Sequence, residues 1–207
     1  SQFTQWLPYK HVVNAVLPGG SAAPMPINRD TLNLHYGLQL TDESEMREFL
    51  QGIREPIEKP ANAEEHLFSI YGRELTDLFF GRYTYKMWGL KLSEMPISVV
   101  ARLPVRYGDE APYFDDEFQA MPAEGYLPLI EKMLAHERIE VRLTTAFDKQ
   151  MEEQYTHVFN SMPIDEYFDN EFGPLPYRSI KFDHRFNESF DYDVPTVNFT
   201  DDGKYTR

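Results

Sequence analysis

Aromatic side chains gather in the stretch FFGRYTYKMW, residues 79–88, which holds five aromatic rings in ten residues. Phe79 and Tyr83 are four positions apart, so a helix would place both rings on one face. Trp88 precedes Gly89, a residue that can end the helix and leave the indole exposed. A row of rings beside an exposed indole is suited to stacking against a flat ligand.

Two arginines follow the rings in the segment ARLPVR. Arg102 and Arg106 bracket a Leu-Pro-Val turn, which can aim both guanidiniums at one bidentate anion such as a diphosphate. The alternative is that the rings belong to the hydrophobic core and that the arginines pair with Glu94 or Asp109. The residues alone leave both interpretations open.

Other kinds of site find little support in the sequence. Its six histidines show no His-x-x-x-His or His-Glu-x-x-His spacing and it has no cysteine, so we expect no metal site. It contains neither the Gly-x-Ser-x-Gly of a nucleophile elbow nor the Gly-x-Gly-x-x-Gly of a dinucleotide-binding turn. Its 34 acidic residues make some carboxylate pair unavoidable by chance, so a glycosidase-like pair stays open without support. No residue of the sequence is predicted to be catalytic.

The formal charge of −14 limits the partners of the protein. A surface this acidic repels a polyphosphate backbone, so we expect no nucleic-acid binding, and an anionic ligand must be held by local arginines. The apolar runs fall well short of the about 20 residues that span a bilayer, so we expect no membrane insertion. The start of the sequence shows no secretory leader, and the absence of cysteine fits a cytoplasmic protein.

The hydrophobic pattern places strands toward both ends of the sequence and helices between them. Thr41, Asp42 and Glu45 form a capping signature for one helix, and Asn62 with Glu65 forms another. The expected elements are a hairpin at 11–27, helices at 41–53, 62–81 and 126–137, a helical piece around Ser93, strands at 139–143 and 155–162, and a hairpin at 195–206. This order predicts an α+β fold, an antiparallel β-sheet with a helical insertion.

Several motifs occur in an order that resembles one enzyme family. Residues 72–126 contain, in turn, Gly-x-Glu-Leu, Phe-Phe-x-x-Tyr-Thr-x-Lys-x-Trp-Gly, Ser-Glu-x-Pro, Arg-x-Pro-Val-Arg, Gln-x-Met-Pro and Gly-Tyr. PINRDTLN precedes them, and HVFNSMPIDEYFD, LPYRSIKF and VNFTDDGKYTR follow. This series is similar to that of the prokaryotic UDP-galactopyranose mutases, and the resemblance covers nearly the whole sequence.

The resemblance implies an enzyme that interconverts UDP-galactopyranose and UDP-galactofuranose, with reduced FAD as the nucleophile. It implies that this sequence forms the substrate domain of a flavoprotein. The expected division is a sheet hairpin at 1–28, a helical substrate-binding domain at 29–101, and a mobile loop, sheet and remainder leading toward the FAD domain at 102–207. We expect the amino-terminal Rossmann part and the C-terminal part of the family to be absent here. FAD would then be bound mainly by the missing domain, and the isolated segment would be inactive.

The resemblance also assigns roles to individual positions. Phe79, Tyr83 and Thr84 match the residues that hold the uridine, with Tyr83 stacked on the uracil. Arg102 and Arg207 match the two arginines that bind the diphosphate. The remaining substrate-binding positions are Trp88, Tyr113 and Asn198, with Arg178 as a further candidate and Arg106 as a structural residue of the motif.

Three other interpretations stay open. A non-catalytic nucleotide-sugar binding module would use the same rings and arginines without any flavin. A structural protein with an aromatic core would use neither. A related flavoenzyme acting on another UDP-sugar would differ only in the sugar part of the site. A homodimer is a further expectation that the residues do not decide.

Overall fold

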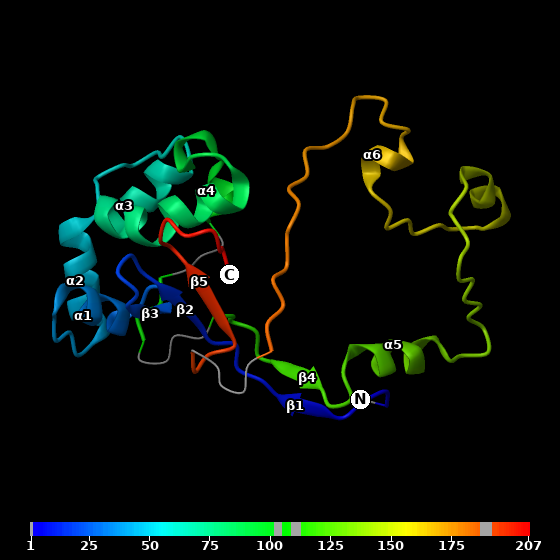
Figure 1. Ribbon diagram of the computed structural model, residues 1–207, viewed down its shortest axis with the longest axis horizontal. Coiled ribbons are helices and arrows are strands. Elements are labelled where there is room, and N and C mark those ends of the chain that lie inside the picture. Colours follow the sequence, from blue (N-terminus) through cyan, green and yellow to red (C-terminus); the bar gives the residue numbers. More distant parts are fainter. Residues whose placement is uncertain (1, 102–104, 109–112, 187–191) are drawn as a thin grey trace. The chain divides into compact units, whose positions relative to one another are not determined.

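The computed structural model describes residues 2–101, 105–108, 113–186 and 192–207 (Figure 1). The chain forms two units, each with its own internal contacts. The main unit consists of Tyr9–Gln119 and Asp183–Arg207, and the small unit of Ser1–Pro8 and Ala120–Phe182. The division expected from the sequence, at 28/29 and 101/102, stays a prediction.

A three-stranded sheet lies in the main unit. Strands β2 (Val13–Val16) and β3 (Ala22–Met25) are antiparallel, with Val13 opposite Met25. The turn between them contains Gly19 and Gly20 with φ values of 95° and 89°, which glycine adopts without strain. The predicted amino-terminal hairpin is therefore confirmed.

The third strand, β5 (Thr196–Phe199), was expected to form a hairpin with the residues after it, and that prediction is wrong. β5 instead lies parallel to β2, with Ala15 opposite Asn198, so the sheet order is β3-β2-β5. One backbone hydrogen bond, from Phe199 N to Thr206 O at 3.1 Å, joins β5 to the following segment. Pairing with β2 buries Val197 and Asn198, a gain that a local turn cannot supply. The sheet therefore contains one antiparallel and one parallel pair of strands, whereas a purely antiparallel sheet was predicted. The predicted α+β class is confirmed.

The helical part of the main unit lies next to this sheet (Figure 1). Both predicted capping signatures are confirmed, because Asp42 accepts from Glu45 N at 2.9 Å and Asn62 accepts from Glu65 N at 2.9 Å. The elements are α1 (Arg29–Tyr36), α2 (Glu43–Ile53), α3 (Ala63–Thr76), the π-helical turn η1 (Asp77–Gly81), α4 (Arg82–Trp88), and the short 3₁₀ turns η2 (Leu92–Glu94) and η3 (Ile97–Val99).

Helix α1 was not predicted, although its start carries a signal. Asn28 and Thr31 form a reciprocal cap, in which Thr31 N donates to Asn28 Oδ1 at 3.0 Å and Asn28 N to Thr31 Oγ1 at 3.2 Å. The helical piece expected around Ser93 is present only as η2 and η3. Short segments of this kind lie below the length at which periodicity is readable.

The long helix predicted to end at Gly81 continues further. It passes through η1 into α4, and Gly89 ends it with φ 70° and an N–H donated to Tyr85 O at 2.7 Å. Trp88 is consequently the last residue of α4 and is 48% exposed, as the sequence predicted. Because η1 adds one wide turn, it sets the rotation at which α4 presents its side chains.

The hydrophobic core of the main unit joins the sheet to these helices. Tyr71 and Leu75 of α3 and Phe79 of η1 are almost completely buried in it. The core continues through β2, β3 and α2 by way of Val13, Ala15, Ala23, Met46 and Leu50. Burial at this level fixes the helix that carries the residues of the site described below.

The small unit contains less regular structure. Its elements are β1 (Trp6–Pro8), which pairs antiparallel with β4 (Ala120–Pro122), then α5 (Tyr126–Leu134), the 3₁₀ segment η4 (Lys149–Gln154) and α6 (Ile164–Tyr167). Helix α5 confirms the prediction for 126–137. The strands predicted at 139–143 and 155–162 are wrong, because no described residue pairs with either segment and a strand needs a hydrogen-bonded neighbour. Among the described residues, no helix has the length and apolar character to cross a membrane.

Gly72 yields a prediction about stability. It interrupts α3 with φ 73°, and a Cβ at this position would lie 2.4 Å from the carbonyl oxygen of Ile53 at the end of α2. We expect Gly72→Ala to lower the free energy of unfolding by about 1–3 kcal/mol or more, since it adds backbone strain to a close contact. Urea unfolding of the complete polypeptide that carries this sequence measures the loss.

The matched control is Gly52→Ala, in α2, where an added Cβ meets no atom within 4 Å. Alanine at a helical position with free space should leave stability unchanged or raise it by about 0.5–1 kcal/mol. Equal effects of the two substitutions would contradict the account of the α2–α3 contact.

Candidate functional site

A cavity of about 360 Å³ lies in the main unit, where α4 faces the sheet. Its walls come from η1, α4, η3, the end of β3, β5 and the last residue of the chain. The described residues that line it are Met25, Phe79, Phe80, Tyr83, Thr84, Met87, Trp88, Ser98, Val99, Val100, Tyr113, Asn198, Thr200 and Arg207.

The helical wall consists of two neighbouring rows of side chains. Members of each row are four positions apart, so they lie above one another on the helix surface. One row is Phe79, Tyr83 and Met87, and the other is Phe80, Thr84 and Trp88. Both rows cross from η1 into α4, so the wide π-helical turn contributes to their alignment.

Burial is graded along these rows. Phe79 is 1% exposed and packs in the core, whereas Tyr83 is half-buried and Trp88 is exposed. The interpretation of Phe79 as a core residue is confirmed, and its ring also forms the inner wall of the cavity. Stacking of the rings on a ligand stays a prediction. The accessible rings are those of Tyr83 and Trp88, which can stack on a planar ligand.

The sheet wall contributes a buried amide. Asn198 on β5 is only 6% exposed, and a buried polar group needs a hydrogen-bond partner. Its Oδ1 accepts a hydrogen bond from Nε of Arg207 at 3.1 Å. Strand β5 thus holds the side chain of a residue that follows nine positions later.

Arg207 connects the sheet wall to the helical wall. Besides its bond to Asn198, its Nη2 donates to the hydroxyl of Tyr83 at 3.0 Å. Within the part of the chain that the structure describes, these bonds engage two of the five N–H donors of the guanidinium, so the other three can donate to an anion. The arrangement places a fixed cation next to an aromatic ring, which is a suitable combination for an anionic group attached to a planar one.

Tyr113 reaches the cavity from a segment that is itself held by aromatic contacts. The ring of His11 meets it edge-on at a centroid distance of 5.3 Å, and the neighbouring Phe114 ring lies 4.9 Å away. Arg106 forms an ion pair with Asp115, and its Nη2 lies 3.5 Å from the carbonyl oxygen of Tyr113. This agrees with a structural role for Arg106.

The ring of Tyr71 packs against Phe80, a residue of the cavity wall. The rings of Tyr71 and Phe80 are 5.4 Å apart, and Tyr71 is 1% exposed. Burial raises the pKa of the Tyr71 hydroxyl, Tyr107 adds to this effect, and Arg106 opposes it. The Tyr71 hydroxyl consequently stays neutral at physiological pH. Among the described residues that line the cavity, Arg207 is the only one with a positive charge.

The structure brings together seven of the residues singled out from the sequence: Phe79, Tyr83, Thr84, Trp88, Tyr113, Asn198 and Arg207. Arg102 lies outside the described residues, and so does Asp109. Arg178 belongs to the small unit and is exposed there. Their roles, like those of the seven, stay predictions.

Sequence reasoning missed other residues of the cavity wall. Phe80 and Met87 could have been found from the same four-residue spacing that pointed to Tyr83. The rest are residues from distant segments that no local pattern connects, namely Met25, Ser98, Val99, Val100 and Thr200.

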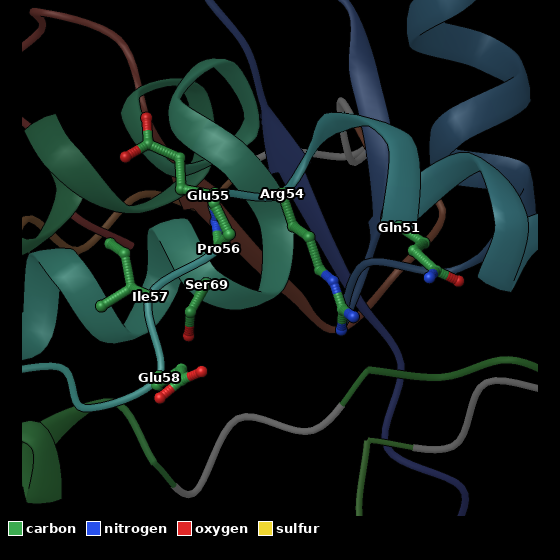
Figure 2. Close-up of a pocket in the computed structure, with 7 residues that line it drawn as sticks. All are labelled: Gln51, Arg54, Glu55, Pro56, Ile57, Glu58 and Ser69. Atoms are coloured by element: carbon green, nitrogen blue, oxygen red, sulfur yellow. The ribbon is translucent and has the colours of Figure 1, made fainter.

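A second hollow, in the main unit, has a different character. It lies between the end of α2, the segment that follows it, and α3. The residues that line it are Gln51, Arg54, Glu55, Pro56, Ile57, Glu58 and Ser69 (Figure 2). Arg54 and the two glutamates point in different directions, and Glu55 pairs with Arg73. This hollow has no aromatic ring, so it lacks the combination found in the first cavity. Within the described ranges, no group of three or more histidine, aspartate or glutamate side chains could hold a metal ion.

Comparison with known proteins gives one family model and several relatives that are named as pyranose mutases. The family model described as UDP-galactopyranose mutase matches residues 78–207. The chain is 34% identical, over 100% of its length, to a probable UDP-galactopyranose mutase of Klebsiella pneumoniae, and covers 54% of that protein. It is 35% identical, over 91% of its length, to the dTDP-fucopyranose mutase of Escherichia coli, and covers 52% of it. A UDP-galactopyranose mutase of Mycoplasma pneumoniae is 30% identical over 50% of the chain, which covers 29% of that protein. The chain thus spans about half the length of the first two relatives.

The graded burial of the helical wall yields a second prediction. Phe79→Ala removes a ring that is 1% exposed and should cost about 3–5 kcal/mol of unfolding free energy, because it leaves a cavity in the core. Trp88→Ala removes a ring that is 48% exposed and should cost about 1 kcal/mol. Urea unfolding of both variants measures the difference. A larger loss for Trp88→Ala would show that the indole, and not Phe79, is the core residue.

Proposed function

Because this chain belongs to the UDP-galactopyranose mutase family, we propose that its cavity binds the nucleotide and diphosphate of a UDP-sugar for flavin-dependent interconversion of UDP-galactopyranose and UDP-galactofuranose. The observation that supports this proposal most directly is the pair of hydrogen bonds that joins Arg207 to Asn198 and Tyr83. It combines a ring, a buried amide and a cation at one place, which are the groups that a nucleoside diphosphate requires.

The aromatic rows supply the proposed site for the base. Tyr83 is half-buried and its ring faces the cavity, so it is the residue proposed to stack on the uracil. Phe79 forms the apolar floor behind it, and Thr84 lies on the adjacent row. Trp88 and Tyr113 also line the cavity and are the residues proposed to contact the sugar. Stacking of this kind contributes about 0.5–1.5 kcal/mol beyond the area that it buries.

The diphosphate is assigned to Arg207. An anion that displaces water from a fixed guanidinium gains a charge-assisted hydrogen bond without the cost of ordering the side chain. Arg102, which lies outside the described residues, is the second arginine of the proposal. Two such cations can hold an anion that a chain of charge −14 would otherwise repel.

Reduced FAD is proposed to be bound mainly outside this chain. The described residues form no glycine-rich turn between a strand and a helix, since Gly19 and Gly20 join β2 to β3. These residues therefore do not fit an FAD site of their own. Their proposed part in the reaction is to bind and orient the sugar nucleotide, and residues 1–207 alone are expected to lack turnover. The cytoplasmic location and the homodimer stay predictions from the sequence.

A second candidate is a mutase that acts on a dTDP-sugar. The observation that favours it is the 35% identity, over 91% of the chain, to the dTDP-fucopyranose mutase. Thymine differs from uracil by one methyl group, and the cavity wall contains the apolar side chains of Met25, Met87 and Val99, which can accept it. Both candidates bind a pyrimidine nucleoside diphosphate, and they differ in the methyl group of the base, in the 2′-hydroxyl of the pentose and in the attached sugar.

Titration of the complete polypeptide with UDP, followed by tryptophan fluorescence, tests this proposal. We expect saturable quenching in the unmodified protein and its loss in Trp88→Phe, because Trp88 lines the cavity. Arg207→Ala should weaken UDP binding by about 10- to 100-fold, the effect of losing a charge-assisted hydrogen bond. Parallel titration with dTDP distinguishes the two candidates by which nucleotide binds more tightly.

The matched control is Arg54→Ala, which removes an arginine of the second hollow (Figure 2) and should leave the affinity for both nucleotides unchanged. A flat titration with UDP and dTDP on a folded protein would refute the proposal.

A further inference from the structure

Lys86 occupies an unusual position for a lysine. It lies on α4, and its side chain is only 15% exposed. Its Nζ donates to the backbone carbonyl of Tyr205 at 2.7 Å and to Oδ1 of Asp201 at 3.3 Å. Lys86 is not among the described residues that line the cavity.

The segment that Lys86 contacts is the one that leads to Arg207. The segment leaves β5 at Thr200, whose N–H donates to Val16 O at 3.0 Å, and it closes where Phe199 N donates to Thr206 O at 3.1 Å. Between these two points, Asp201 accepts from Gly203 N at 3.1 Å. The backbone is therefore fixed at both ends of the loop, and Lys86 contacts its interior from α4.

We infer that Lys86 is a positioning residue for the cation of the cavity. It ties the loop 201–206 to the same helix that carries Tyr83, so the backbone that precedes Arg207 and the Tyr83 hydroxyl that accepts from Arg207 are both held by α4. The inference rests on the proposed function, since it assumes that Arg207 binds the diphosphate. A cation held in place before binding loses less conformational freedom when the anion arrives.

Arg82 provides a contrast on the same helix and the same loop. It pairs with Asp202 at 2.8 Å, but the two side chains are 64% and 78% exposed. Water and salt screen such a pair, and its contribution is small. Lys86 differs because it is shielded and because one of its acceptors is a backbone carbonyl, which fixes the chain itself.

The experiment compares UDP and uridine binding to the complete polypeptide and its variants, by titration calorimetry or by displacement. Lys86→Met keeps the unbranched side chain up to the atom before Nζ and removes its charge and donors. We expect it to weaken UDP binding on the order of tenfold, the loss typical of a displaced charge-assisted hydrogen bond, and to leave uridine binding unchanged. Arg82→Gln should change neither affinity by more than about twofold.

A double-mutant cycle separates positioning from a general effect on structure. In an Arg207→Ala background, Lys86→Met should have no further effect on UDP affinity, because Lys86 acts through Arg207. An undiminished effect in that background, or an equal loss of uridine binding, would overturn the inference. The inference would also be overturned if Lys86→Met alone bound UDP as tightly as the unmodified protein.

A second variant keeps the test decisive if Lys86→Met fails to fold, which thermal unfolding reports. Lys86→Gln keeps a polar side chain at this shielded position but is shorter and uncharged, and it should weaken UDP binding with uridine binding unchanged. Unaltered UDP affinity in a folded Lys86→Gln variant would overturn the inference. Absence of UDP and dTDP binding in the unmodified protein would refute the proposed function itself, whereas binding that is insensitive to Lys86 refutes only this inference.

Discussion

The parallel pairing of β5 with β2 is the constraint on which the site depends. It brings Asn198 next to a helix that lies more than a hundred positions earlier in the chain, and the buried oxygen of Asn198 requires a donor. Arg207 supplies that donor and reaches Tyr83 with a second one. Without β5 in this position, the rings of α4 would form an apolar surface with no fixed cation beside it.

The helix opposite the sheet depends on a different set of constraints. Gly72 lets α3 pass close to the end of α2, and η1 then adds a wide turn before α4. Together they determine which side chains of α4 face the sheet. The buried core, which includes Phe79, stabilises this geometry. The fold therefore does not require Trp88 and Tyr83 to be buried, and both rings can face the cavity.

Local patterns predicted the elements that are stabilised locally. The caps at Asp42 and Asn62 and the turn at Gly19–Gly20 involve residues within a few positions of each other, and each is present. The predicted pairing of β5 and the predicted strand at 139–143 were wrong, because strand pairing depends on residues far away in the chain. For the site, the four-residue spacing identified Phe79 and Tyr83, but the contribution of Met25 and Val100 became visible only in the folded chain.

The central claim is that Tyr83, Asn198 and Arg207 form a nucleoside-diphosphate site, and a crystal structure of the complete polypeptide with bound UDP tests it most directly. The account predicts the base stacked on the Tyr83 ring and a diphosphate oxygen within hydrogen-bond distance, about 2.7–2.9 Å, of Arg207. A nucleotide bound elsewhere, for example in the hollow beside Arg54, with the cavity next to Arg207 empty, would contradict it.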